Sequence, residues 1–327
     1  MELESVIMLK DLKVVFMGTP DFCVPILESL IENCNVIGVV TQPDKEVGRK
    51  KEIKFSPIKE VALKNNLNIF QPIKIRTNYQ DILDLNPDII ITCAYGQIIP
   101  KAILDYPKYG CITVHASLLP KLRGGAPIHH AIIDGYNETG ITIMYMDEGM
   151  DSGDIIEQSK TIIEDSDTVE TLHDRLSLMG RDLLIKTLPS IIEGNNKRIK
   201  QDEKDVTFGY NIKREEELID FNKTSREVFN HIRGLNPFPG GYFTLNKKIV
   251  KVYKVNEIND NKYQDKENGE IVKIDKESFY IKVIDGLIQV LEIKFEGKKK
   301  MKVQDFLNGN QESLLGIIVN KGVNNEK

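Results

Sequence analysis

The first half of the chain alternates short apolar runs with amphipathic stretches, and this alternation restricts the possible folds more than any other feature. Apolar runs predict buried strands at residues 14–17, 36–40, 89–91 and 112–114. Apolar residues at helical spacing predict helices at residues 24–31 and 58–63. Because strands that alternate with helices form βαβ units, the pattern predicts an α/β fold with a Rossmann-like, mostly parallel sheet.

The remainder of this half continues the pattern. Further strands are predicted at residues 141–146 and 154–162, followed by a long helix at 168–192. Thr168 is the expected N-cap of that helix, and Pro189 predicts a kink or an early end.

The second half has a different character. Residues 194–212 are polar, charged and aperiodic, which is typical of a linker. A helix at 224–235 is followed by five short predicted strands, at residues 241–245, 249–255, 271–274, 279–283 and 287–295. Five strands in so short a stretch fit a small OB-like β-barrel. The predicted domains are residues 1–193, a linker at 194–212, and residues 213–327.

Composition narrows the class of protein. No uncharged apolar run reaches the ~18 residues that a membrane span needs, and the start of the chain is acidic rather than basic. The four cysteines lack the CxxC spacing of zinc sites or redox motifs. We therefore expect a cytoplasmic protein with no membrane partner, no disulfide framework and no bound metal.

The net charge of −5 argues against bulk adhesion to nucleic acid, but basic residues are clustered. One cluster contains Arg49, Lys50 and Lys51, and another contains Lys298, Lys299 and Lys300. A single charged run is most often a solvated surface. Two such clusters together favour a polyanionic partner.

Two segments carry groups suited to catalysis. His115 ends a predicted parallel strand, where α/β enzymes place their sites, and a Ser-Leu-Leu-Pro turn follows it at residues 117–120. A lone histidine is more often structural. Residues 146–154 form a carboxylate-rich glycine loop that contains Asp147 and Asp151. Gly18 lacks the second glycine of a dinucleotide-binding fingerprint, so that class of site is not indicated.

In combination, these segments resemble the folate-dependent formyltransferases, and most closely those that act on methionyl-tRNA. The resemblance covers almost the whole chain and rests on matches in order at residues 18–22, 41–44, 48–50, 115–128, 142–154, 233–239, 297–301 and 304–308. It implies transfer of a formyl group from 10-formyltetrahydrofolate to the α-amino group of methionine on the initiator tRNA, by a monomer. It also implies that His115 gives or takes the proton and that Asp151 orients His115 or a bridging water.

The resemblance also assigns binding residues. The formyl-folate is expected against Asp147 and two short segments: Ala94, Tyr95, Gly96, Gln97 and Ile98, and then Ser117, Leu118, Leu119 and Pro120. Arg49 matches the arginine that contacts the acceptor stem of tRNA in the family. The neighbouring Lys50 and Lys51 and the cluster Lys298–Lys300 are expected to bind tRNA as well.

One position departs from the family. Thr113 stands where the family has asparagine, two residues before the histidine. The threonine hydroxyl is on a shorter arm than an amide, and loss of one oxyanion donor costs ~10²–10³ in rate. Thr113 also suits a buried strand simply as a β-branched residue.

Three other functions are compatible with parts of the sequence. One is formylation of an amino sugar nucleotide, and another is hydrolysis of formyltetrahydrofolate. The third is an OB-type nucleic-acid-binding protein without catalysis, which leaves His115 and Asp151 unexplained. The basic clusters favour tRNA over a small acceptor.

Overall fold

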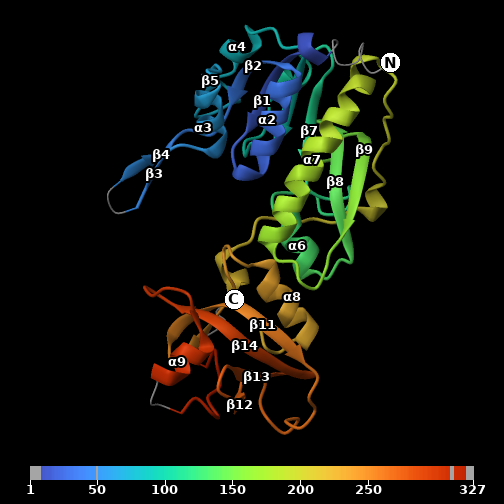
Figure 1. The fold of residues 1–327 in the computed structure, drawn as a ribbon. Coiled ribbons are helices and arrows are strands. Elements are labelled where there is room, and N and C mark those ends of the chain that lie inside the picture. Colours follow the sequence, from blue (N-terminus) through green and yellow to red (C-terminus); the bar gives the residue numbers. More distant parts are fainter. Residues whose placement is uncertain (1–8, 49–50, 310–312, 322–327) are drawn as a thin grey trace. The chain divides into compact units, whose positions relative to one another are not determined.

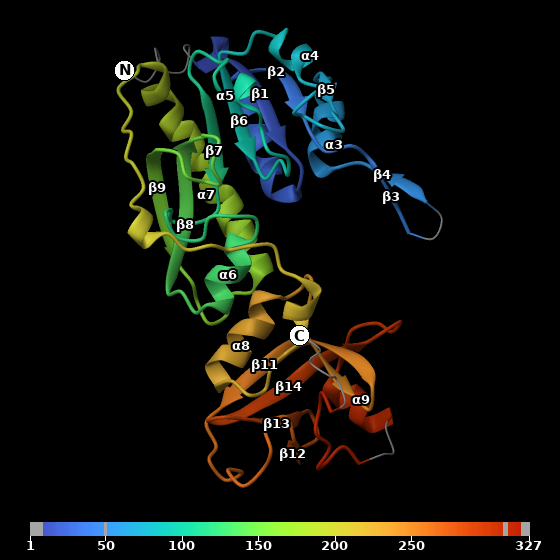
Figure 2. The same cartoon turned by 180° about the vertical axis from the view of Figure 1, so that it is seen from behind.

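A computed structural model describes residues 9–48, 51–309 and 313–321, which form two compact units (Figures 1 and 2). The first unit consists of Met1–Pro127, Glu138–Ile162 and His173–Tyr210. The second consists of Ile128–Asn137, Ile163–Leu172 and Asn211–Lys327. Most of the predicted linker at 194–212 therefore lies within the first unit. Among the described helices, none has the length and apolarity needed to cross a membrane.

A seven-stranded sheet organises the first unit in the order β5-β2-β1-β6-β7-β8-β9. Its strands are β1 (Lys13–Gly18), β2 (Asn35–Val40), β5 (Ile69–Phe70), β6 (Ile89–Cys93), β7 (Cys111–His115), β8 (Glu138–Tyr145) and β9 (Ile155–Ile162). The pairs from β5 to β7 are parallel, whereas β8 and β9 pair antiparallel at one edge. This confirms the predicted α/β fold with a mostly parallel sheet.

Helices cover both faces of this sheet. The helical elements of this unit are α2 (Val24–Asn33), α3 (Pro57–Lys64), α4 (Gln80–Leu83), α5 (Lys101–Leu104) and most of α7 (Val169–Ile192), whereas α6 (Pro127–Ile133) belongs to the second unit except for its first residue. Helix α7 crosses one face, where Gly180 lies against Val114 of β7 and Ile141 of β8. On the other face Ile103 of α5 and Ile82 of α4 pack with Ile90 of β6. The sheet is therefore enclosed, and its strand ends are where polar side chains gather.

Two local features differ from expectation. Helix α7 continues through Pro189 to Ile192, so the predicted early end is wrong. The buried neighbours Leu188 and Ile191 supply packing that outweighs the hydrogen bond that proline cannot make. A charged hairpin of β3 (Lys45–Val47) and β4 (Glu52–Lys54) was not predicted, because it has no apolar alternation to reveal it.

The second unit is built on an antiparallel sheet in the order β10-β11-β14-β13-β12, with β15 paired to β14. Its elements are α8 (Ser225–Gly234), β10 (Tyr242–Leu245), β11 (Lys248–Ile258), β12 (Ile271–Ile274), β13 (Phe279–Val283), β14 (Gly286–Phe295), β15 (Met301–Lys302) and α9 (Val303–Gly309). The sheet curls around Phe243 and Phe279, and Ile232 of α8 packs against the same core. The second domain, predicted as a small OB-like β-barrel, is an antiparallel, curled sheet that is consistent with that prediction.

Helix α8 begins at a capping box that the sequence already contains. The Thr224 hydroxyl accepts from the Glu227 amide at 3.3 Å, and the Glu227 carboxylate accepts from the Thr224 amide at 2.9 Å. Two backbone donors at the helix start are thereby satisfied, which fixes the first residue of the helix.

Helix α8 also carries a histidine that responds to pH. Burial, and then the nearby Lys223 ammonium, lowers the pKa of His231 to about 4. Below pH ~6.5, the ordinary histidine pKa, His231 is protonated in the unfolded chain but stays neutral in the folded chain. The free energy of unfolding therefore falls as the pH drops towards 4. Between pH 7 and pH 5 we expect a loss of about 2 kcal/mol in the free energy of unfolding. Urea denaturation at pH 7 and pH 5 measures it, and a His231→Phe variant should lose less; an equal loss in both proteins contradicts the assignment.

Candidate active site

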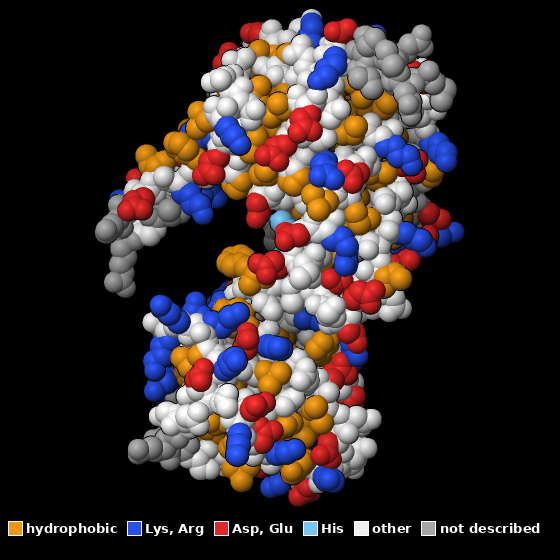
Figure 3. Space-filling view, in the orientation of Figure 1, with side chains coloured by type: hydrophobic (Ala, Val, Ile, Leu, Met, Phe, Trp, Pro, Cys, Tyr) orange, Lys and Arg blue, Asp and Glu red, His pale blue; other side chains and the backbone are white. Residues whose placement is uncertain are grey.

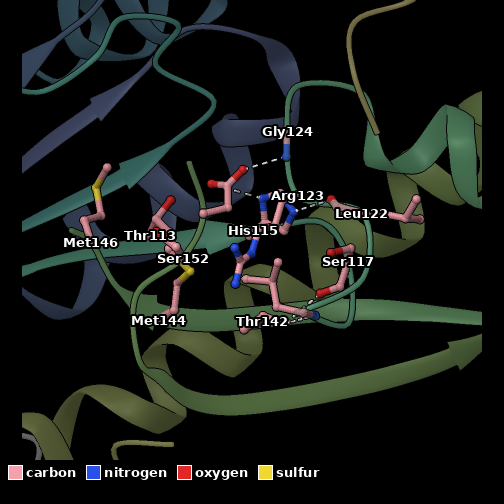
Figure 4. Close-up of polar contacts among 12 residues, drawn as sticks. Thr113, His115, Ser117, Leu122, Arg123, Gly124, Thr142, Met144, Met146 and Ser152 are labelled. Carbon is pink, nitrogen blue, oxygen red and sulfur yellow. Dashed lines mark hydrogen bonds and ion pairs between the residues drawn. The ribbon is translucent and has the colours of Figure 1, made fainter. Parts of the chain in front are cut away.

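His115 is the last residue of β7, and its side chain is only 8% exposed. Its Nε2 atom lies 3.0 Å from the carbonyl oxygen of Leu122. Because a carbonyl only accepts hydrogen bonds, Nε2 carries a proton in this arrangement. The other ring nitrogen, Nδ1, lies 3.7 Å from Oδ1 of Asp151 (Figure 4). Nε2 is thus engaged by the backbone, while Nδ1 faces a carboxylate at a distance longer than a hydrogen bond.

Asp151 lies in the loop between β8 and β9, with a left-handed backbone at φ +50°. Its Oδ2 atom accepts a hydrogen bond of 2.7 Å from the Gly124 amide. The carboxylate is therefore held between a backbone donor and the imidazole. It thereby limits the orientations open to both side chains.

The Ser-Leu-Leu-Pro turn is fixed by side chains of the two antiparallel strands. The hydroxyl of Thr142, a fully buried residue in β8, donates to the Ser117 carbonyl at 2.7 Å and accepts from the Leu119 amide at 3.1 Å. The side-chain Nε2 of Gln158 in β9 donates to the Leu119 carbonyl at 3.0 Å. The Ser117 hydroxyl donates to the Lys121 carbonyl at 2.6 Å. The turn is thus pre-shaped next to His115.

Thr113 precedes His115 by two residues on β7 and is 8% exposed. Its hydroxyl donates to the Thr92 carbonyl of the adjacent strand β6 at 3.3 Å. The hydroxyl proton is therefore engaged within the sheet. An oxyanion near His115 gains a donor from Thr113 only if this bond is given up.

The segment after β6 forms a tight loop that residues outside it hold in place. Ala94 and Gly96 have φ of +44° and +89°, and the Tyr95 carbonyl between them accepts from the side-chain Nε2 of Gln42 at 2.9 Å. The Gln97 carboxamide accepts from the Ile75 amide at 2.9 Å. Side chains of this loop face different ways: Tyr95 is buried with its pKa raised to about 12 by burial, whereas Ile98 is 66% exposed.

Asp147 has a local role in the loop that also holds Asp151. Its Oδ1 atom accepts from the Gly149 amide at 3.0 Å and from the Ser152 hydroxyl at 2.8 Å. These bonds close the turn, while the residue itself is exposed. Within residues 9–48, 51–309 and 313–321 no three His, Cys, Asp or Glu side chains are grouped as metal ligands would be.

The basic residues lie in two places. Lys51 is exposed on the β3–β4 hairpin, 3.7 Å from the Glu46 carboxylate, while Arg49 and Lys50 lie outside the described residues. Lys298, Lys299 and Lys300 are exposed on the second unit. There a groove of about 770 Å³ is lined by residues that include Lys247, Lys248, Phe295, Lys298, Met301 and Phe306. Figure 3 shows blue side chains gathered on one side of this unit.

Comparison with known proteins identifies the family. A profile described as "Formyl transferase" matches residues 12–188, and one described as "Formyl transferase, C-terminal domain" matches residues 211–311. The methionyl-tRNA formyltransferase of Bacillus cereus (strain AH187) is 52% identical over 302 residues, which cover 91% of this chain and 96% of the relative. The chain belongs to the formyl transferase family. A methionyl-tRNA formyltransferase of Bacillus thuringiensis subsp. konkukian is 51% identical over the same length.

Solved structures with this fold are more distant from the formyl transferase described here. The N-formyltransferase from Helicobacter canadensis, in complex with folinic acid and dTDP-3-aminofucose, has a TM-score of 0.62 at 22% identity and covers 89% of this chain and 100% of its own. HypX from Aquifex aeolicus, in complex with tetrahydrofolic acid, has a TM-score of 0.60 at 13% identity and covers 90% of this chain and 46% of its own. At these identities the likeness concerns the fold.

Sequence reasoning placed His115, Asp151 and the Ser117–Pro120 turn near one another, and the structure brings them together. It gave no role to Thr142 and Gln158, which shape the turn, or to Lys247 and Lys248, which line the basic groove. Thr142 is a polar residue in an otherwise apolar predicted strand. That position was the signal in the sequence that could have indicated its role. A charged pair in a hairpin turn was the signal for the two lysines.

Proposed function

We propose that this formyl transferase moves the formyl group of 10-formyltetrahydrofolate to the α-amino group of methionine on initiator methionyl-tRNA. The observation that carries the proposal is the pairing of His115 with Asp151 at the end of β7. The close relatives, which share half of their residues with this chain along nearly its whole length, support the choice of acceptor.

The reaction needs a group that moves one proton. The methionyl amine attacks the formyl carbon, and the resulting tetrahedral intermediate carries an oxyanion and an ammonium group. Nδ1 of His115 takes a proton from that nitrogen and returns it to N10 of the folate as the C–N10 bond breaks. Asp151 stabilises the imidazolium between the two transfers, and such general acid–base help contributes typically ~10²–10⁴-fold.

The formyl-folate is proposed to bind along the loop of residues 94–98 and the Ser117–Pro120 turn. Asp147 is proposed to lie at the edge of this binding site. Both segments present backbone groups that are already fixed by hydrogen bonds. A preformed loop of this kind loses little conformational entropy when a ring binds against it. The exposed side chain of Ile98 offers an apolar surface for the folate.

The tRNA is proposed to bind through two basic clusters: Arg49, Lys50 and Lys51, which follow β3 in the sequence, and Lys298–Lys300 in the second unit. The groove beside that cluster combines lysines with Phe295 and Phe306, a composition suited to phosphates and bases. We expect the enzyme to act as a monomer in the cytoplasm, without a membrane partner and without a metal.

A single assay separates this proposal from its alternatives. The purified enzyme is supplied with 10-formyltetrahydrofolate and, in parallel, with charged initiator tRNA, a nucleotide-linked amino sugar, or water alone. Formyl-methionyl-tRNA is the expected product. Preferential formylation of the sugar, or release of formate at the same rate without an acceptor, contradicts the proposal.

Neutralising the hairpin tests the tRNA contacts. In the variant Arg49→Ala/Lys50→Ala/Lys51→Ala we expect the KM for charged tRNA to rise about tenfold or more and its dependence on salt to become shallower. Each phosphate contact releases counterions when it forms. Each contact that is lost therefore lowers the slope of log K against the logarithm of the salt concentration by ~0.9. The KM for formyl-folate should stay within about twofold of the parent, because folate is proposed to bind elsewhere.

A matched control carries the same change of charge at dispersed, exposed lysines: Lys64→Ala/Lys186→Ala/Lys276→Ala. Its KM for tRNA should change much less than that of the hairpin variant. If the KM for tRNA rises equally in the two triple variants, the rise is due to net charge. The hairpin then has no specific role in tRNA binding.

A further inference from the structure

The segment between the two family profiles runs across the first unit and takes part in its catalytic region. Residues 199–210, here called the crossing segment, pair with β9 where the Ile199 amide donates to the Ile155 carbonyl at 2.9 Å. Further along, the Arg123 amide donates to the Thr207 carbonyl at 2.9 Å, and the Gly209 amide donates to the Arg123 carbonyl at 2.8 Å. The crossing segment therefore forms a short ladder beside the loop that follows the Ser-Leu-Leu-Pro turn.

Gln201 connects the crossing segment to the Asp151 loop. Its Nε2 atom donates to the carbonyl oxygens of Asp151 at 2.8 Å and Gly153 at 2.9 Å. Its Oε1 atom accepts from Nε of Arg123 at 3.0 Å. One carboxamide thus fixes two backbone carbonyls of the loop while a guanidinium fixes the carboxamide itself.

Arg123 is well placed for that purpose because it is nearly immobile. Its side chain is only about 6% exposed, and its NH2 atom lies 2.9 Å from the Glu203 carboxylate, also in the crossing segment. A guanidinium held on both sides in this way presents a fixed donor to Gln201. The orientation of the carboxamide is consequently set before any substrate arrives.

The crossing segment also holds the partner of His115. The Thr207 hydroxyl accepts from the Leu122 amide at 2.9 Å, and Leu122 has a left-handed backbone at φ +59°. The Leu122 carbonyl is the group that receives Nε2–H of His115. One segment therefore sets both sides of the pair: Asp151 through Gln201, and His115 through Thr207.

We propose that Gln201 is a positioning residue for formyl transfer, acting through Asp151. The inference rests on the proposed roles of His115 and Asp151. Asp151 has an unfavourable left-handed backbone, and the bond from Gln201 to its carbonyl helps to hold that conformation. Without it the carboxylate is free to leave the imidazole, and the imidazolium loses its counter-charge in the transition state.

Two substitutions distinguish the effect of the Gln201 N–H donors from the effect of the volume of its side chain. Gln201→Met keeps the length and removes both functions, whereas Gln201→Glu keeps the shape and the acceptor for Arg123 but removes the two N–H donors. We expect both variants to lower kcat about tenfold or more, with the KM values for folate and tRNA within about twofold of the parent. A Gln201→Glu or Gln201→Met protein that is folded and keeps the parental kcat overturns the proposal.

A double-mutant cycle tests whether Gln201 acts through Asp151. The variants are Gln201→Met, Asp151→Asn and their combination, compared by single-turnover formylation with enzyme in excess. If Gln201 only positions Asp151, adding Gln201→Met to Asp151→Asn should change the rate less than about twofold. Two independent losses that multiply show a general structural effect and overturn the proposal.

The control is the neighbouring Asp202→Ala, whose carboxylate accepts from the Lys204 amide at 3.0 Å within the same segment. It should stay within about twofold of the parental kcat, and a loss as large as that of Gln201→Met again indicates general loosening. The parent enzyme is assayed first. A parent that does not formylate methionyl-tRNA refutes the proposed function, whereas an active parent with unaffected Gln201 variants refutes only the positioning role.

Discussion

Replacement of His115 by alanine is expected to lower kcat for formyl transfer about 10²–10⁴-fold while the protein remains folded. The physical reason is that Nδ1 of His115 is the atom proposed to carry the proton from the methionyl amine to N10 of the folate. Among the described residues, the Asp151 carboxylate contacts Nδ1 of His115 and the backbone amide of Gly124. His115 therefore supplies the only ring nitrogen among these contacts. Quenched-flow measurement of formyl-methionyl-tRNA gives the rate.

Asp151→Asn should produce a loss in the same range, because the amide cannot balance the positive imidazole. Asparagine is the better substitution here, since it tolerates the left-handed backbone at φ +50° more readily than alanine does. The KM values should change less than kcat, because the charge develops during the reaction rather than on binding.

Asp154→Asn serves as the control for this pair. Asp154 lies three residues further on, and its carboxylate contacts Arg198 at 3.2 Å rather than His115. It should retain most of the parental rate. If a well-folded His115→Ala or Asp151→Asn protein keeps more than about a third of that rate, the assignment of the pair is wrong.

Thr113→Asn is expected to raise kcat about tenfold or more. The Thr113 hydroxyl donates to the Thr92 carbonyl in the neighbouring strand, whereas the side-chain amide of asparagine carries its donor one bond further from the backbone. A donor that acts chiefly in the transition state raises kcat rather than folate affinity. The gain should be below the ~10²–10³ of a full oxyanion donor, because solvent water is itself able to donate to an oxyanion.

Steady-state kinetics of the two proteins on identical charged tRNA decides this prediction. Thr113→Val is the companion variant, since it removes the hydroxyl without extending the arm, and it should stay within about twofold of the parent. An unchanged or lower kcat in folded Thr113→Asn shows that the pocket has adapted to threonine.

Local patterns in the sequence were sufficient for much of the fold. The apolar runs at β1, β2, β6 and β7 predicted their strands, because a strand covered on both faces has to be apolar throughout. The helix predicted at residues 224–235 is present as α8, whose capping box of Thr224 and Glu227 lies within four residues. Motifs in order along the chain indicated the family, and they singled out His115 and Asp151, whose roles stay predictions.

Tertiary structure decided the features that depend on residues far apart in the chain. The path of α7 through Pro189 follows from packing around it, which outweighs the local preference of proline. Gln201 lies 50 residues from Asp151, and its segment is polar and aperiodic, so no local pattern indicated that it donates a hydrogen bond to the Asp151 carbonyl. The physical reason is that periodicity reports which face of an element is buried. The partner of a single buried hydrogen bond is set only when the chain has folded.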